Sequence, residues 1–106
     1  MIVAKAVYSN KSFLSLSVNG HGGEEIGKDI YCAGVSACVI GALNALDAGE
    51  NYQLDISSGH VDVKALSFPT KHDEIVLETL ICQLDTMAKS YPERIKLIIS
   101  KKEGQK

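Results

Sequence analysis

Alternation of apolar and polar residues dominates the first twenty positions. Residues 2–8 are rich in Val, Ile and Tyr, and the pattern of residues 13–18 (FLSLSV) places Leu14, Leu16 and Val18 on one face. A period of two is typical of strands that bury one side. A polar Ser-Asn-Lys-Ser stretch separates the two runs, so the pattern predicts a β-hairpin.

A helical period follows a polar, glycine-rich stretch. From Ile30 to about Asp47 the apolar positions recur every three or four residues, which predicts an amphipathic α-helix. Gly49 comes soon after, where glycine commonly ends a helix. The expected buried stripe consists of Cys32, Ser36, Val39, Leu43 and Leu46, and it is widened by Val35, Cys38, Ala42 and Ala45.

The second half of the chain repeats this order of elements. Residues 52–56 and 61–65 alternate on either side of a Ser-Ser-Gly-His turn, which predicts a second hairpin. Residues 71–90 then carry an apolar face at helical spacing, and Tyr-Pro ends that pattern. Residues 94–99 are an apolar run suited to a closing strand.

The predicted element order is therefore ββαββαβ. This order favours an α+β fold in which two helices pack on one face of a mixed β-sheet. At 106 residues the chain fits a single domain, which we expect over residues 1–100. Residues 101–106 form a charged tail that we expect to be frayed.

Composition and charge narrow the classes of function. The formal net charge of −2 argues against broad binding to nucleic acid, which needs clustered Lys and Arg. Residues 1–5 (MIVAK) lack the pattern of a secretory signal, and no apolar run approaches membrane-spanning length. The cysteines number three, and an odd count suits reduced thiols. We therefore expect a cytoplasmic protein that binds neither membrane nor, directly, nucleic acid.

Cys32 lies where the first helix should begin. If Asp29 is the N-cap, Cys32 is the third residue of the first turn, where unpaired N–H groups and the positive dipole end favour a thiolate. The thiolate is the nucleophilic form of cysteine, and the same N–H groups can hold an oxyanion. Cys32 is therefore our candidate nucleophile.

His21 is the candidate base for this thiol. An extended chain of the intervening length spans roughly 35 Å, so the imidazole can fold back to the sulfur. The loop between them is rich in glycine, which makes such folding easy and would let the loop close over a bound peptide. The glycines of this flexible active-site loop are Gly20, Gly22, Gly23 and Gly27.

Three further residues are candidates for supporting roles. Asp29 can cap the helix or orient His21, and both alternatives stay open. Ser36 lies one turn after the cysteine, so its hydroxyl can reach the sulfur or a substrate carbonyl. Gly34 keeps the surface around the sulfur low, which would let a peptide backbone approach.

The same signals also have purely structural interpretations. A cysteine on an apolar helix stripe is usually a small core residue, and we assign Cys38 and Cys82 to the core on that ground. His60 and His72 are expected at the surface. The chain has neither CxxC nor HxxxH spacing, so we expect no metal site and no cofactor.

The segment around His21 and Cys32 carries a set of motifs, and further ones follow in the second hairpin. They are Gly20-His21, a short acidic loop with glycines, Gly27-x-Asp29-Ile30-x-Cys32-Ala33-Gly34-x-Ser36-Ala37, Asn51-Tyr52 and Ser58-Gly59-His60. On these motifs the chain resembles the ribosomal-processing cysteine protease (Prp) family, and its length and predicted ββαββαβ order are similar to the family as well.

The resemblance implies a catalytic dyad of Cys32 and His21, with Asp29 and Ser36 in support. It further implies a homodimeric bacterial endopeptidase that removes the short N-terminal extension of large-subunit ribosomal protein twenty-seven. Cleavage in the family follows aromatic residues, so an apolar pocket is expected near Cys32. Two departures concern the loop: it is one residue shorter than is usual in the family, and Gly22 stands where alanine is common.

Two other functions stay open. The chief alternative is a non-enzymatic, ribosome-associated module that binds the same extension without cutting it. A thiol-based redox or acyl-transfer protein is the third, although Cys32 has no CxxC partner beside it.

Overall fold

The computed structural model describes residues 1–25 and 28–102. The strands and helices follow the predicted ββαββαβ order. Neither helix of this described part is long and apolar enough to cross a bilayer. The elements are β1 (Ile2–Ser9), β2 (Ser12–Gly20), α1 (Ile30–Asn44), a short 3₁₀ turn (Gly49–Asn51), β3 (Tyr52–Ser57), β4 (His60–Ala65), α2 (Lys71–Ser90) and β5 (Ile95–Lys101).

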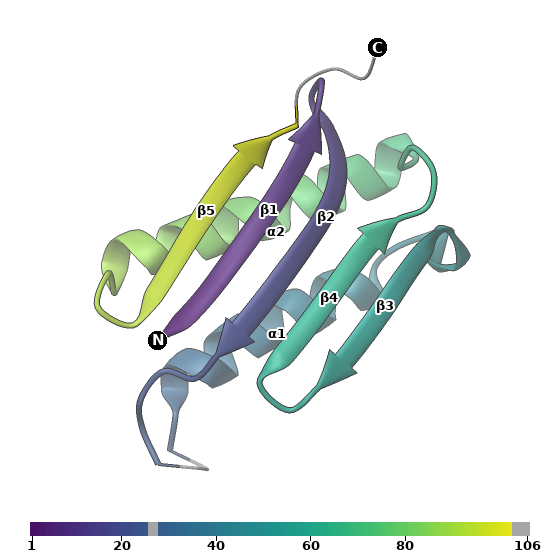
Figure 1. Cartoon of the computed structure of the whole chain (residues 1–106). Coiled ribbons are helices and arrows are strands. Elements are labelled where there is room, and N and C mark those ends of the chain that lie inside the picture. Colours follow the sequence, from purple (N-terminus) through teal and green to yellow (C-terminus); the bar gives the residue numbers. More distant parts are fainter. Residues whose placement is uncertain (26–27, 103–106) are drawn as a thin grey trace.

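The strands form one mixed sheet in the order β3-β4-β2-β1-β5. Strand β5 runs parallel to β1, and every other neighbouring pair is antiparallel. Both helices lie on the same face of this sheet, as predicted (Figure 1). The end of β2, the start of α1 and the β3–β4 turn meet at one edge of the molecule, at the bottom of Figure 1.

A β-bulge changes which residues of the first hairpin face the helices. The register of the β1–β2 pair shifts between Val7 and Tyr8 of β1, and Leu14 of β2 has no partner on β1. An extra residue of this kind reverses the alternation of side chains along the strand. Phe13 is therefore buried in the core with Leu16 and Val18, whereas Leu14 is only half-buried. The prediction that Leu14 belongs to the buried face is wrong.

The core lies between the sheet and the two helices. The two fully buried residues of α1 are Val35 and Val39, while Ser36 is exposed, so the buried stripe is rotated relative to the predicted one. Helix α2 contributes Leu77, Leu80 and Leu84. The sheet residues of the core are Ile2, Ala4, Ala6, Phe13, Leu16, Val18, Tyr52, Val63 and Ile95.

Two element boundaries differ from the predicted ones. Helix α1 ends at Asn44, three residues before the expected Asp47, because the backbone N–H of Asp47 donates to the side chain of Asp73 instead of continuing the helix. Strand β5 continues to Lys101, beyond the expected Ile99, because it stays paired with β1 along its whole length. The N–H of Lys102, the next residue of the predicted tail, donates to the Tyr8 carbonyl at 2.7 Å, and residues 103–106 lie outside the described residues.

Candidate active site

Cys32 lies in the first turn of α1. Asp29 is the N-cap of this helix, and its Oδ1 accepts the Cys32 N–H at 2.9 Å, as expected for a cysteine at the third helical position. The thiol is half-buried and belongs to no disulfide. The positive end of the helix dipole is therefore close to a partly accessible sulfur.

The imidazole of His21 lies beside this sulfur. A ring nitrogen of His21, the Sγ of Cys32 and a carboxylate oxygen of Asp29 lie within 4.8 Å of one another. His21 follows directly after β2 and is exposed, whereas the other two residues belong to the start of α1. The fold thus gathers the predicted nucleophile, base and supporting carboxylate in one place.

Asp29 connects the His21 loop to the helix. Its Oδ2 accepts the N–H of Gly22 at 2.7 Å, while Oδ1 accepts the N–H of Cys32. These hydrogen bonds hold the pKa of the Asp29 carboxyl below its usual range, the one from Cys32 most strongly, and the charge of His21 adds to the effect. The structure therefore has the capping geometry for Asp29, with the imidazole close enough for the charges to interact.

Gly22 is buried, and no side chain larger than that of glycine fits at its position. A Cβ added there would lie 2.3 Å from Asp29 Oδ1 and 2.7 Å from the Cβ of Tyr31. An alanine at this position would therefore need a different loop path.

Two other glycines shape the surroundings of His21. Gly20 has φ +105°, and a Cβ there would meet the backbone oxygen of Met1 at 2.1 Å. Gly59, in the β3–β4 turn, has φ +72°, and a Cβ there would lie 2.8 Å from His21 Nε2. Gly59 therefore packs against the imidazole, a contact that the sequence analysis missed, since it named this glycine only in a turn and in a motif of the resemblance.

The remaining loop and helix glycines differ in their surroundings. Gly23 has φ +93°, which favours glycine, and Gly27 lies outside the described residues. Gly34 faces the other helix, because an added Cβ would lie 3.6 Å from the Sδ of Met87. Gly34 is thus a helix-packing position rather than the expected close approach beside the sulfur, and Ala33 lines the cleft instead.

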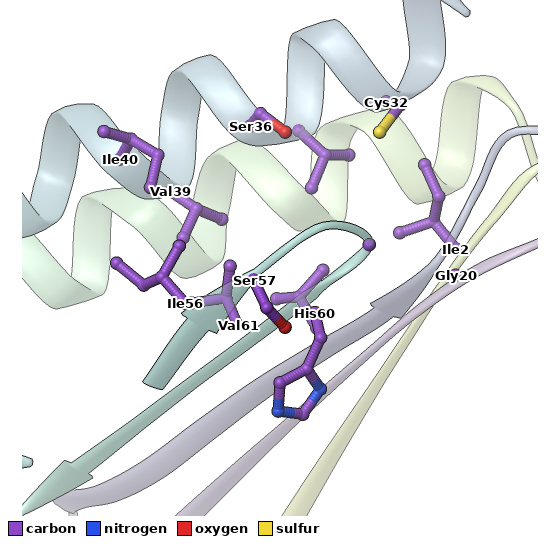
Figure 2. Close-up of a pocket in the computed structure, with 13 residues that line it drawn as sticks. Ile2, Gly20, Cys32, Ser36, Val39, Ile40, Ile56, Ser57, His60 and Val61 are labelled. Atoms are coloured by element: carbon purple, nitrogen blue, oxygen red, sulfur yellow. The ribbon is translucent and has the colours of Figure 1, made fainter. Parts of the chain in front are cut away.

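An apolar cavity of about 160 Å³ opens next to Cys32, between α1 and strands β2 to β4 (Figure 2). Beyond the thiol lies a wider, more open cleft of about 740 Å³. Cys32 and Ser36 line both, so the sulfur and the serine hydroxyl stand at their junction. Side chains that line the apolar cavity include Ile2, Val18, Val35, Val39, Ile40, Ile56 and Val61, and the cleft adds His21, Glu24, Lys28, Asp29, Ile30, Ala33 and Ser58.

The other cysteines and histidines lie apart from this junction. Cys38 is half-buried against the core, but Cys82 is exposed on α2, so its assignment to the core is wrong. The ring of His60 turns away from the cavity (Figure 2) and bonds to Asn19 and Asp62. His72 is half-exposed at the start of α2.

A thiol at a helix N-terminus beside an imidazole and an open cleft is typical of a cysteine hydrolase. The cysteine protease Prp family matches residues 1–96. The chain is 31% identical over 85 residues to the ribosomal processing cysteine protease Prp of Staphylococcus aureus, covering 76% of this chain and 80% of that protein. It is 32% identical over 100 residues to the protein of the same name from Bacillus subtilis, covering 83% and 87%.

Solved structures agree with this relationship. The S. aureus protease Prp in complex with a covalently linked product peptide has a TM-score of 0.82 at 27% identity, covering 93% of this chain and 99% of that one. A Streptococcus mutans protein has a TM-score of 0.75 at 26% identity, with 96% of each chain covered. The chain belongs to the Prp family of ribosomal-processing cysteine proteases. The resemblance predicted from the motifs is confirmed.

Proposed function

We propose that this protease removes the short N-terminal extension of large-subunit ribosomal protein twenty-seven, with Cys32 as nucleophile and His21 as general base and acid. The observation that carries the proposal is the position of the Cys32 sulfur, within 4.8 Å of a His21 nitrogen and at the junction of cavity and cleft. The coarser activity, a cysteine protease, is that of the family.

Cleavage would proceed through a thioester. The Cys32 thiolate attacks the scissile carbonyl carbon, and His21 gives its proton to the amine as the C–N bond breaks. Water then attacks the thioester carbonyl while His21 takes its proton, which releases the acid and restores the thiol. Asp29 supports this cycle by fixing the start of α1 and the His21 loop.

The oxyanion needs a hydrogen-bond donor other than the Cys32 N–H, because Asp29 already accepts that group. We assign this part to Ser36, whose exposed side chain lines both cavity and cleft one turn beyond the sulfur. Its hydroxyl can donate to the substrate carbonyl as negative charge develops there.

The apolar cavity suits an aromatic side chain just before the cut. Its volume of about 160 Å³ is close to that of an apolar cavity of about 150 Å³ that binds benzene in another protein. Another solved structure with a similar fold is that of S. aureus Prp in complex with a substrate peptide. We therefore infer a precursor peptide as the partner, and we place the activity in the cytoplasm, in a homodimer as the resemblance implies.

The test uses a synthetic peptide that spans the extension junction. We expect the wild-type protein to cut it after an aromatic residue, and Cys32→Ala and His21→Ala to lower kcat by about a thousandfold or more. Cys38→Ala is the matched control, since it removes a thiol on the same helix away from the cleft, and it should stay within about twofold of wild type. Products are followed by mass spectrometry.

Two outcomes would overturn the proposal. Cleavage that survives Cys32→Ala would exclude Cys32 as nucleophile. Tight binding of the peptide without any product would instead favour a module that only holds the extension.

A further inference from the structure

The side chain of Arg94 connects the loop after His21 to a distant part of the chain. Arg94 Nη1 donates to the backbone oxygen of Gly22 at 2.6 Å, across 72 positions of sequence. The same nitrogen lies 2.7 Å from Glu24 Oε2 in an ion pair. One guanidinium therefore binds the loop at two points within the three residues that follow His21.

Arg94 is itself firmly anchored. Its carbonyl accepts the N–H of Ile2 at 2.8 Å, and its N–H donates to the Tyr91 carbonyl at 2.9 Å, so its backbone is fixed just before β5. The guanidinium lies over the ring of Tyr31, 5.0 Å from the centroid, and that ring packs edge-on against Tyr91. A planar, always charged group held in this way is a rigid donor.

The peptide groups of Gly22 are held from both sides. Asp29 accepts its N–H at 2.7 Å and Arg94 donates to its carbonyl at 2.6 Å. Gly22 directly follows His21, and Asp29 in turn accepts the N–H of Cys32. A continuous set of hydrogen bonds therefore runs from Arg94 through Gly22 and Asp29 to the backbone of Cys32, and His21 joins it through its peptide bond to Gly22.

We propose that Arg94 is a positioning residue that sets the imidazole of His21 relative to the Cys32 thiol. The proposal rests on the proposed roles of these two residues. Arg94 binds the backbone next to His21 and no reacting atom, so its effect should fall on the chemical step rather than on the apolar cavity that receives the substrate. A displacement of the base by about 1 Å is enough to cost a large factor in rate.

The main variant is Arg94→Met, which removes every donor but keeps an unbranched apolar side chain over Tyr31. We expect kcat for the junction peptide to fall about tenfold while KM stays within about twofold. Lys96→Met is the matched control, because Lys96 is an exposed cation of the same chain segment on β5.

A second measurement needs no turnover. On the Cys32→Ala background, Arg94→Met should lower the NMR order parameters of the Gly22 and Gly23 amides from about 0.8 to below about 0.6, whereas Lys96→Met leaves them unchanged. Arg94→Lys keeps the charge but not the two-point geometry and should be intermediate. Thermal unfolding confirms that each variant is folded before it is compared.

The two proposals fail in different ways. Wild-type protein that binds but never cuts the peptide overturns the proposed function, and the relaxation data then still decide whether Arg94 holds the loop. Unchanged order parameters in Arg94→Met, or an unchanged kcat in an active enzyme, overturn the positioning role. A raised KM with unchanged kcat also overturns it, because that result would make Arg94 a substrate-binding group.

Discussion

The two ends of helix α1 are held in a similar way, each by an aspartate whose carboxylate accepts two backbone N–H groups. At the N-terminal end, Asp29 accepts the N–H groups of Cys32 and Gly22. Just after the C-terminal end, Asp73 of α2 accepts the N–H groups of Asp47 and Ala48. A histidine accompanies each aspartate, so the two ends look alike in composition.

Burial separates the two ends. Asp73 is completely buried and also accepts the hydroxyl of Tyr52 at 3.2 Å. Burial, and after it the carboxylate of Asp73, raises the pKa of the Tyr52 hydroxyl, so the phenol remains a donor. Asp29 is only half-buried, and the residues beside it line an open cleft.

The comparison separates a structural role from a functional one. A buried carboxylate whose oxygens are all engaged stabilises the fold and leaves no access for a substrate. The half-buried carboxylate of Asp29 lies beside a thiol and an imidazole, at a cleft that solvent and peptide can enter. Similar hydrogen bonds therefore serve stability at one end of α1 and positioning at the other.

The largest effect on stability should come from Asp73→Ala. The substitution leaves the N–H groups of Asp47 and Ala48 and the hydroxyl of Tyr52 without their buried acceptor, so we expect a loss of about 3 kcal/mol in the free energy of unfolding. Urea titration measures it. Glu74→Ala, which removes an exposed acid of the same helix turn, should cost less than about 0.5 kcal/mol.

The same variant sharpens the comparison between the two ends. In folded Asp73→Ala protein, alkylation of Cys32 by iodoacetamide should keep its wild-type rate within about twofold, because Asp73 lies at the far end of α1. A stability loss below about 1 kcal/mol, or a clear change in Cys32 reactivity, would contradict the division of roles.

Elements with local signals were predictable from the sequence. Helix α2 spans residues 71–90 as predicted, because Thr70 caps its start and Tyr91-Pro92 ends its apolar period. The cap of α1 was predictable for the same reason, since Asp29 and Cys32 are three residues apart. His21 was found through its glycine-rich loop and the family motif.

Features that depend on distant partners were not predictable. The early end of α1 depends on the bond between Asp47 and Asp73, which lie 26 residues apart, and no local pattern marks that contact. The bulge at Leu14 leaves the alternation of apolar and polar residues in the sequence intact, but it reverses which side chains of β2 face the core. Arg94 and Gly59 reach the His21 region only because the sheet brings their segments there.

A moderate effect is expected from Asp29→Ala. Loss of the helix cap should lower the melting temperature by about 5 °C. Loss of the Gly22 partner should lower kcat about tenfold, because His21 is less well placed. Alkylation of Cys32 at about pH 7 should not fall by more than about twofold, since a carboxylate near the sulfur opposes the thiolate.

Asp29→Ser is the matched control, because serine caps the helix but cannot hold both N–H groups. We expect it to restore the melting temperature and not kcat.

The pKa of Asp29 is lowered in the folded protein, so the stability it contributes is present above its unfolded pKa and is lost as the pH falls through the folded value. The difference in melting temperature between wild type and Asp29→Ala should therefore disappear in acid. A difference that persists there would contradict the role of the ionised carboxylate.

The smallest effect should come from replacing His72, which lies beside the C-terminal end of α1. Its Nε2 bonds to the Ala45 carbonyl at 2.9 Å, and this bond, followed by Asp47 and Asp73, raises the pKa of the imidazole. A raised pKa means that the added stability is full below the unfolded pKa and is lost as the pH rises through the folded one. The melting-temperature advantage of wild type over His72→Gln should therefore be about 1–2 °C larger at about pH 5.5 than at about pH 8.5. Cleavage by His72→Gln should be unaffected, because His72 lies at the far end of α1 from the Cys32 thiol. An advantage that grows with pH would show that this end of α1 is not stabilised by a charged histidine.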